Sequence, residues 1–343
     1  MNAFAPLVVF VVLAAADPNG AATLLDKGEQ LFRNGDVAGA LAAFTDAAAA
    51  DPRDARPHYL KGVALEKKGD AAGAAAEYKR AIALQPQMAE AHNNLGALLI
   101  ARGDAAGAAQ ELEAAVKAKP DYAEAHYNLG VARDAQGRPA DAVAAYKQAV
   151  RLKPTEPTYR LNLGAALRKT GDVPGATAAL KEATRLGPRD PVAWADLGML
   201  LSDQKSYDEA SAALEKATKL KPDFALAWNR LGRVALKRGK VPEAVAAQEK
   251  ARKLEPKNGG FAADLCRALL EAKDAGKAAG ACRAAVELDP KSPLAHYELM
   301  KVLVAKGECP AAKGELAKFK GLPGVKPEAQ KQAEAIAATC GRK

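Results

Sequence analysis

Apolar residues recur along this chain at the spacing of an amphipathic helix. In the stretch AEAHNNLGALLIARGD, His92, Leu95 and Leu99 stand at i, i+3 and i+7 and therefore share one helix face. A Gly-Asp turn follows, and Asp104 is well placed as the N-cap of a second helix over residues 105–118 that a proline ends. The pattern therefore predicts two helices joined by a short turn.

The same pattern returns every 34 residues, counted from Ala21. Glycine holds the eighth position in seven windows, and alanine holds the twentieth position in all nine. Alanine also holds the twenty-seventh position, and proline the thirty-second, in eight windows each. We number the nine windows repeat 1 to repeat 9, without insertions between them: 21–54, 55–88, 89–122, 123–156, 157–190, 191–224, 225–258, 259–292 and 293–322.

The small residues at positions 8, 20 and 27 are expected where the two helices of a repeat cross, because a larger side chain would force the helix axes apart. A single helix pair cannot bury its apolar face, so neighbouring repeats must stack. The expected fold class is an all-α solenoid of nine helix-turn-helix repeats. Residues 326–343 are expected to add a C-terminal capping helix with an apolar edge at Ala333, Ile336 and Ala337.

The period, the small residues and the aromatic residues at positions 4 and 24 resemble the tetratricopeptide repeat (TPR) family. The aromatic residues that carry this resemblance are Trp194, Trp228, Phe44, Tyr78 and Tyr146. The stretch AEAHNNLGALLIARGD is most similar to repeats of O-linked N-acetylglucosamine transferases and bacterial scaffold proteins. The resemblance implies a right-handed superhelix whose first helices line a concave groove through positions 2, 5, 6, 9, 12 and 13. It does not imply glycosyl transfer, because the repeats leave no room for a catalytic domain.

The N-terminal segment is typical of a cleaved secretory signal. An apolar run from Leu7 to Leu13 precedes three alanines and Asp17, as at an A-x-A-like cleavage site, although no Lys or Arg precedes the run. The run is shorter than the ~20 residues that a membrane-spanning helix needs, so no stable membrane span is expected. We predict a signal peptide over residues 1–16, with an uncleaved N-terminal helix as the alternative.

Composition and motifs indicate a protein without catalytic chemistry. The net charge is +9 and only 5% of the residues are aromatic, which permits acidic partners but does not indicate nucleic-acid binding. No phosphate-binding, nucleophile or zinc-protease motif occurs, and no cofactor is expected. All four histidines, His58, His92, His126 and His296, hold position 4, where two other repeats have Trp. They are therefore interpreted as packing residues and not as metal ligands.

The resemblance places two kinds of candidate binding residue in the groove. Position 6 reads Asn94, Asn128 and Asn162 in three consecutive repeats, a ladder suited to an extended peptide backbone because an amide both donates and accepts. The alternative is that Asn merely tolerates a solvent-facing helix position.

The second kind of candidate is basic. Repeat 7 carries nine Lys or Arg against three Glu, and Arg230, Arg233 and Lys237 share one helix face. Arg267 and Lys301 repeat position 9 in the next two repeats. This stripe predicts binding of an acidic peptide segment or another anionic polymer, and the alternative is a solvated basic face.

The four cysteines are expected to form two bridges. Cys266 and Cys282 hold positions 8 and 24 of repeat 8, equidistant from the predicted turn, so they should face each other. Cys309 lies in the turn of repeat 9, and Cys340 lies near the end of the capping helix. Buried free thiols are the alternative, and zinc is not expected because no CxxC spacing occurs.

The function expected from these features is a non-enzymatic scaffold that binds a protein or peptide partner outside the cytoplasm, in a bacterial cell envelope. The first alternative is an adaptor or targeting subunit of an envelope enzyme or of secretion or polysaccharide machinery. The second alternative is a cytoplasmic scaffold. The identity of the partner and the oligomeric state stay open.

Overall fold

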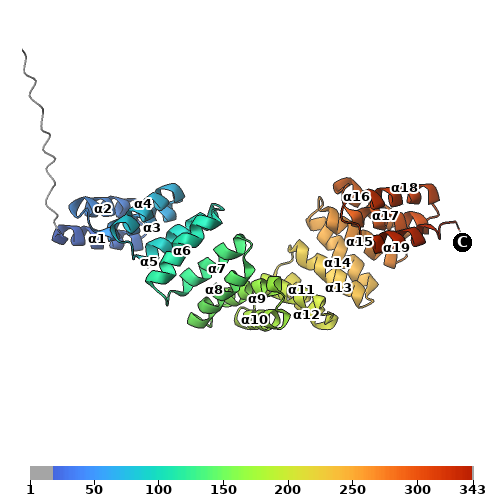
Figure 1. Cartoon of the computed structure of the whole chain (residues 1–343), viewed down its shortest axis with the longest axis horizontal. Helices are drawn as coiled ribbons and strands as arrows, with labels where there is room; N and C mark the ends of the chain where they lie inside the picture. The colour runs from blue at the N-terminus through green and yellow to red at the C-terminus, as the bar shows by residue number, and fades with distance from the viewer. Residues whose placement is uncertain (1–17, 342–343) are drawn as a thin grey trace, which may run out of the picture. The chain divides into compact units, whose positions relative to one another are not determined.

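The computed structural model describes residues 18–341, which form nineteen α-helices and no strand (Figure 1). The chain divides into two compact units, of which the first ends at Thr170 and the second begins at Gly171. The helices of the first unit are α1 (Pro18–Arg33), α2 (Val37–Ala50), α3 (Ala55–Lys68), α4 (Ala71–Leu84), α5 (Ala89–Ala101), α6 (Ala105–Ala118), α7 (Ala123–Ala135), α8 (Pro139–Leu152) and α9 (Pro157–Thr170).

The second unit contains the remaining ten helices. They are α10 (Val173–Leu186), α11 (Pro191–Asp203), α12 (Tyr207–Leu220), α13 (Ala225–Lys237), α14 (Val241–Leu254), α15 (Gly259–Glu271), α16 (Ala275–Leu288), α17 (Pro293–Ala305), α18 (Cys309–Gly321) and α19 (Pro327–Ala337). The all-helical prediction is confirmed, and α19 lies within the segment expected to form the capping helix.

The turn between the two helices of a repeat is set by an aspartate and a glycine. In repeat 3, Gly103 takes φ = 81°, a backbone conformation that glycine adopts without steric cost. The next residue, Asp104, accepts a hydrogen bond from the backbone N–H of Gly107 over 2.9 Å, so it caps α6 as predicted. Asp36, Asp70 and Asp172 cap α2, α4 and α10 in the same way.

The glycine at position 8 lets the two helices of a repeat approach closely. A Cβ added at Gly62 would lie 2.5 Å from the ring of Tyr78, and a Cβ added at Gly96 would lie 2.6 Å from Leu112. Position 24 supplies the facing side chain in both repeats, and Tyr78 and Leu112 are fully buried. The repeat pattern therefore records a packing requirement, as the sequence indicated.

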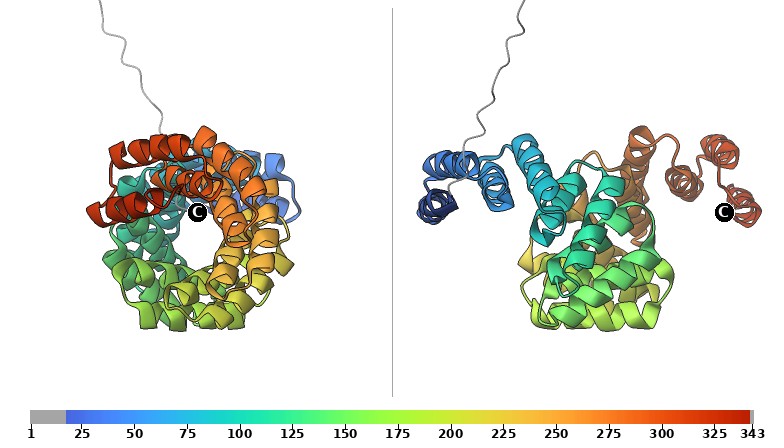
Figure 2. Two further views of the ribbon diagram at one scale, coloured as in Figure 1. Left: turned by 90° about the vertical axis from the view of Figure 1, so that its right-hand side faces the viewer. Right: turned by 60° about the vertical axis from the view of Figure 1, so that its left-hand side comes forward.

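Within each unit, each helix packs against the next helix along the chain, and several first helices also contact each other. In the second unit, α15 contacts α17, and α19 contacts both α17 and α18 (Figures 1 and 2). Ala333 and Ala337 of α19 are buried against this core, and Ile336 packs at its edge. The apolar edge predicted for the last helix thus covers the end of the repeat array.

The predicted signal peptide, residues 1–16, lies outside the described residues. Within the part of the chain that the structure covers, no helix combines the length and the apolar character needed to cross a membrane.

Candidate functional site

Two of the asparagines predicted to line the groove are joined to the preceding repeat in the first unit. Asn128 donates from Nδ2 to Oδ1 of Asn93 over 3.0 Å, and Asn162 donates from Nδ2 to the hydroxyl of Tyr127 over 2.7 Å. Both bonds connect position 6 of one repeat with position 5 of the repeat before it, 35 residues earlier. Each amide therefore uses one N–H group inside the protein, while its carbonyl oxygen can still accept from a ligand.

Asn94 belongs to a small cluster with Asn93, Tyr78 and Glu66. Its Oδ1 accepts from Nδ2 of Asn93 over 3.1 Å, and its Nδ2 donates to the hydroxyl of Tyr78 over 3.3 Å. The Tyr78 hydroxyl in turn donates to the carboxylate of Glu66. Burial and then the bond to Glu66 raise the pKa of Tyr78, so the phenol remains a neutral donor. This cluster fixes the orientation of Asn94.

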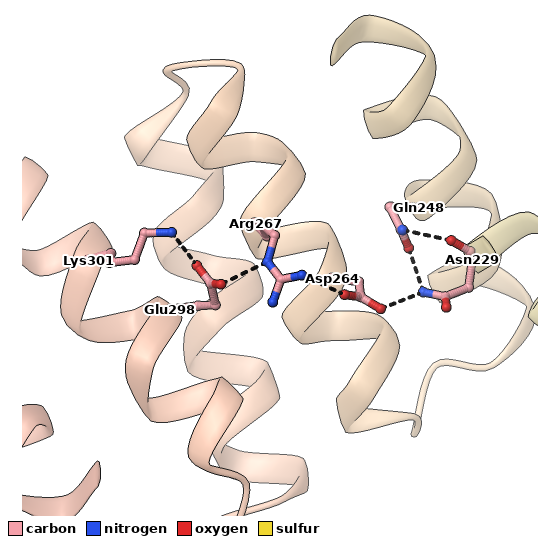
Figure 3. Close-up of polar contacts among 6 residues, drawn as sticks. All are labelled: Asn229, Gln248, Asp264, Arg267, Glu298 and Lys301. Atoms are coloured by element: carbon pink, nitrogen blue, oxygen red, sulfur yellow. Dashed lines mark hydrogen bonds and ion pairs between the residues drawn. The ribbon is translucent and has the colours of Figure 1, made fainter. Parts of the chain in front are cut away.

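A second polar network spans three repeats of the second unit (Figure 3). The Nδ2 of Asn229 donates to Asp264 and to Gln248, over 2.9 Å in each case. Gln248 is fully buried, and its Nε2 donates to the backbone carbonyl of Asn229 over 3.0 Å. The contact between Asn229 and Asp264 again joins position 5 of one repeat to position 6 of the next. The same inter-repeat link therefore occurs in both units with different side chains.

The network continues through the two cations predicted at position 9. Arg267 Nε donates to Oε1 of Glu298 over 2.8 Å, and Lys301 Nζ donates to Oε2 of the same carboxylate over 2.9 Å (Figure 3). Arg267 also pairs with Asp264 at 3.7 Å. Burial opposes the charged form of Arg267, but the bond to Glu298 outweighs it and raises the pKa of the guanidinium.

These contacts change how the basic stripe is read. Arg267 and Lys301 share a carboxylate whose side chain is only 2% exposed, so most of their charge is balanced inside the fold. Counting charges per repeat missed this pairing. The sequence did contain a signal for it, because Asp264 and Glu298 each precede a cation by three residues on the same helix.

Two neighbouring clefts follow the C-terminal ends of α13, α15 and α17. The first has a volume of about 430 Å³ and is lined by Arg233, Lys237, Arg267 and Glu271, with aliphatic walls. Arg233 and Lys237 are exposed, and no ion pair within residues 18–341 holds either of them. Arg230 is half-buried on the same helix and does not line this cleft.

The second cleft, of about 660 Å³, also includes Glu271 in its lining and extends to α19. Lys273, Lys301 and Lys306 line it, of which Lys301 is paired with Glu298 and Lys306 with Glu308. Val304 and Ile336 are among its apolar walls. We call the two clefts together the basic trough. Cations outnumber the single lining carboxylate, and the apolar walls lower the local dielectric, so the trough is suited to a carboxylate-bearing ligand.

Comparison with protein families identifies the repeats. A tetratricopeptide repeat family model matches residues 25–89, 66–123, 93–157, 127–191 and 195–260, which together make up more than half of the chain. The chain belongs to the tetratricopeptide repeat family. The resemblance seen in the sequence is therefore confirmed. No curated protein matches the chain.

Solved TPR structures share this fold. YrrB, described as a TPR protein with an unusual peptide-binding site, is 24% identical with a TM-score of 0.50, over 54% of this chain and 95% of that one. The Cut9 and Hcn1 hetero-tetramer of the APC/C gives 20% identity and a TM-score of 0.57, over 82% of this chain and 55% of the other. PilF of Pseudomonas aeruginosa is 20% identical with a TM-score of 0.54, over 61% of this chain and 95% of PilF. At these identities the similarity shows the fold alone.

Position 4 of the TPR unit has a polar role that the sequence reading missed. The ring Nε2 of His92 lies 3.1 Å from the carbonyl of Pro86, and the indole Nε1 of Trp194 donates to the carbonyl of Pro188 over 3.1 Å. His126, Trp228 and His296 make the same contact with the proline six residues earlier. His and Trp can therefore replace each other at position 4 for two reasons: each ring packs against neighbouring side chains, and each carries an N–H that donates a hydrogen bond to this carbonyl.

Three of the histidines also bind a glutamate at position 23 of the same TPR unit. Nδ1 of His58 lies 2.7 Å from Glu77, and Nδ1 of His92 lies 2.7 Å from Glu111. His296 makes the equivalent contact with Glu315 at 2.5 Å. Each pair is isolated in its own repeat, and no group of three or more potential metal-ligating side chains occurs within residues 18–341.

The structure brings the four cysteines together in the two expected pairs. The Cα atoms of Cys266 and Cys282 are 5.1 Å apart, and those of Cys309 and Cys340 are 5.6 Å apart. Both separations are in the range that a disulfide requires. Cys266 and Cys282 occupy the positions that Gly96 and Leu112 hold in TPR repeat 3, so the first pair takes the place of the usual contact between positions 8 and 24.

Proposed function

We propose that this protein is a non-enzymatic scaffold that binds an acidic segment of a protein partner in the basic trough. The observation that carries this proposal is the pair Arg233 and Lys237, which are exposed beside an aliphatic cleft and have no ion-pair partner among residues 18–341. A carboxylate bound there would gain charge-assisted hydrogen bonds in a partly apolar setting. Arg267 and Lys301 would contribute less, because Glu298 already balances them.

The experiment compares two synthetic peptides that differ only in charge. Fluorescein-labelled repeats of Glu-Leu-Gly-Ser and of Gln-Leu-Gly-Ser are titrated with the full chain, and binding is followed by anisotropy. The double variant Arg233→Glu/Lys237→Glu is expected to bind the acidic peptide at least about tenfold more weakly. Reversal of Arg267 is avoided, because it would place a carboxylate beside Glu298 and disturb the fold.

Lys219→Glu/Lys253→Glu is the matched control, since these lysines are exposed on second helices and line neither cleft of the trough. It changes the net charge by the same amount and should bind like the unmodified chain. Equal loss in both variants would point to a general charge effect, and unchanged binding in the Arg233→Glu/Lys237→Glu variant would contradict the proposal.

In the first unit, we assign the carbonyl oxygens of Asn128 and Asn162 to an extended peptide backbone, together with the second lone pair of the Asn94 carbonyl, whose first accepts from Asn93. The hydrogen bonds to Tyr127 and Asn93 hold two of these amides in fixed orientations, which reduces the entropy lost on binding. Substitution of Asn128 by Asp keeps the shape and the acceptor but removes the donor to Asn93. Such a variant should loosen the contact between α5 and α7. Peptide binding should also weaken, because the acceptor at position 128 is no longer held in a fixed orientation.

We further propose that the protein acts outside the cytoplasm. The two cysteine pairs at disulfide distance support this location, because such bridges persist in oxidising compartments. N-terminal sequencing of the native protein tests it: Asp17 at the N-terminus supports export, and retention of Met1 opposes it. An adaptor role for an envelope enzyme is the second candidate, and it would place the catalytic activity in the partner.

A further inference from the structure

The two tryptophans of the chain line two equivalent crevices in the second unit. Trp228 lies in a crevice of about 740 Å³ between α12, α13 and α14. Trp194 lies in one of about 620 Å³ at the corresponding place one repeat earlier. Leu197 and Leu231, both at position 7, line the respective crevices. Positions 4 and 7 lie on the opposite side of the first helix from the groove positions 5, 6 and 9. These crevices are therefore separate from the basic trough.

Each tryptophan is held in place. The indole N–H of Trp194 is bonded to Pro188, and that of Trp228 donates to the carbonyl of Pro222 over 3.0 Å. Each tryptophan packs against a core cluster that contains buried alanines, and the side chains remain half-buried. The indoles are therefore apolar surfaces held in place, which favours binding over a surface that must first become ordered.

Other repeats of the same chain show what fills this space. In repeat 2, Glu77 at position 23 is bound by Arg80 at position 26 over 3.0 Å. In repeat 9, Glu315 at position 23 is bound by Lys318 at position 26 over 2.8 Å. A glutamate side chain thus lies beside the position-4 ring, with its carboxylate on a cation of the next helical turn.

Repeats 6 and 7 keep the cation but lack the glutamate. Lys216 and Lys250 hold position 26 and line the two crevices, while position 23 is Ala213 or Ala247. Both lysines are exposed, and neither has an ion-pair partner among residues 18–341. In each of these two consecutive repeats, the absence of the glutamate leaves an apolar space beside an unpaired lysine.

The other charges at the crevices do not cancel these lysines. Glu209, at the Trp194 crevice, is already paired with Lys181 at 3.4 Å. At the Trp228 crevice, Glu215 accepts from Ser211 over 2.8 Å. Glu243 and Lys240 also line this crevice, and Arg238, which lines it too, is paired with Asp208 at 2.8 Å. No carboxylate of either lining is ion-paired with Lys216 or Lys250 among residues 18–341.

We propose that the two crevices form a second docking site, which takes acidic side chains of a protein partner. The occupant would be a segment with two glutamates, each laying its aliphatic stem against a tryptophan and its carboxylate on Lys216 or Lys250. The segment would thus reproduce in trans the contact that Glu77 and Glu315 make in their own repeats. This site does not depend on the basic trough.

Tryptophan fluorescence tests the proposal directly, because the chain contains only these two tryptophans. The full chain is titrated with unlabelled Glu-Leu-Gly-Ser repeats, and with the Gln counterpart as the reference. Only the acidic peptide should shift the tryptophan emission, and the Arg233→Glu/Lys237→Glu variant should give the same shift. An emission shift together with anisotropy binding that Arg233→Glu/Lys237→Glu does not weaken would reject the proposed function and keep this site. Anisotropy binding that this variant weakens, with no emission shift in the unmodified chain, would reject this site alone.

Two variants complete the test. Ala213→Glu/Ala247→Glu supplies the missing glutamates from within the chain and should abolish the emission shift. Lys216→Gln/Lys250→Gln changes only exposed side chains, so it tests the proposal even if the first variant does not fold. This variant is expected to bind the acidic peptide at the crevices about tenfold more weakly. Lys219→Gln/Lys253→Gln is the matched control and should bind normally. No emission shift with the unmodified chain, or an undiminished shift in Lys216→Gln/Lys250→Gln, would overturn the proposal.

Discussion

Arg267 donates a hydrogen bond over 2.8 Å to Glu298, a carboxylate on the neighbouring first helix that is almost fully buried. This contact decides how the basic face of the second unit works. It makes Arg267 part of the structure that holds repeats 8 and 9 together, and it leaves Arg233 and Lys237 as the cations of the first cleft that remain open to a partner.

Replacement of Glu298 by Gln should destabilise the second unit. The change removes the shared acceptor of Arg267 and Lys301 and leaves two partly buried cations without their carboxylate. Because the side chain of Arg267 is 31% exposed, water screens part of the loss, and we expect a decrease of about 2 kcal/mol in the free energy of unfolding. Urea denaturation measures it. Glu287→Gln, at an exposed position, is the control, and equal stability of the two variants would show that the network is not a stabilising element.

The His-Glu pairs should make stability depend on pH. Burial acts to raise the pKa of Glu77, but the hydrogen bonds from His58 and Lys61 outweigh it, so the pKa is lowered. The pKa of Glu315 is lowered against burial in the same way by its own lysine and histidine partners. In the unfolded chain both carboxyls return to their ordinary range. The stabilisation is therefore present above that range, and it is lost as the pH falls through the lowered folded values.

Denaturant unfolding at neutral pH and at successively lower pH measures this dependence. The double variant Glu77→Gln/Glu315→Gln should lose about 1–2 kcal/mol per site at neutral pH and should show a shallower decline in acid. The unmodified chain and the variant should converge at the lowest pH. Parallel curves for the two proteins would contradict the assignment.

Two glycine substitutions should have opposite effects. In Gly62→Ala the new Cβ would lie 2.5 Å from the ring of Tyr78, so the helices must separate, and a loss of about 1–3 kcal/mol is expected. In Gly280→Ala the new Cβ meets nothing within 4 Å on an exposed helix face, and a gain of about 0.5–1 kcal/mol is expected from helix propensity. Thermal unfolding of both variants checks the pair. A stable Gly62→Ala protein would refute the close helix crossing.

The cysteine pairs should be oxidised in the native protein. Thiol counting under denaturing, non-reducing conditions should find no free thiol. Reduction of the bridge between Cys266 and Cys282 should lower the free energy of unfolding by about 3 kcal/mol, because a disulfide that closes a loop of about 15 residues stabilises a protein by about that amount. In Cys266→Gly/Cys282→Leu, which restores the pair found at Gly96 and Leu112, reductant should affect only the remaining bridge. Four free thiols would contradict the bridges and weaken the case for export.

Much of the fold could be predicted from the sequence, because the 34-residue period encodes a repeated packing contact. Gly62 predicted a close helix crossing, and Asp104 predicted a helix start; the structure contains both. The cysteine pairing followed from the same register. The period is informative because each repeat meets nearly the same neighbours, so one physical explanation applies to many residues.

The parts that could not be predicted depend on contacts between repeats, and on the space that opens where one repeat has a smaller side chain than the others at the same position. Counting charges placed Arg267 in an open stripe, since a sum over one repeat does not include a partner such as Glu298 in the next repeat. Reading His92 as a packing residue missed its bond to Pro86, because the period identifies equivalent positions but not their hydrogen bonds. The crevice beside Trp228 depends on Ala247 holding the position that Glu77 and Glu315 hold in their repeats, and the period alone does not show how much space that exchange leaves.

Photo-cross-linking from Leu236, which lines the cleft beside Arg233 and Lys237, tests the central claim most directly. A photoreactive amino acid replaces Leu236 in the full chain and, as the control, Lys253 on a second helix. The protein is irradiated in its native cells, and the cross-linked segment is identified by mass spectrometry. Cross-links are expected from position 236 to an acidic segment of a protein partner. They should be absent from position 253 and lost in the Arg233→Glu/Lys237→Glu background. Cross-links to a neutral or basic segment, or cross-links that survive this charge reversal, would contradict the central claim.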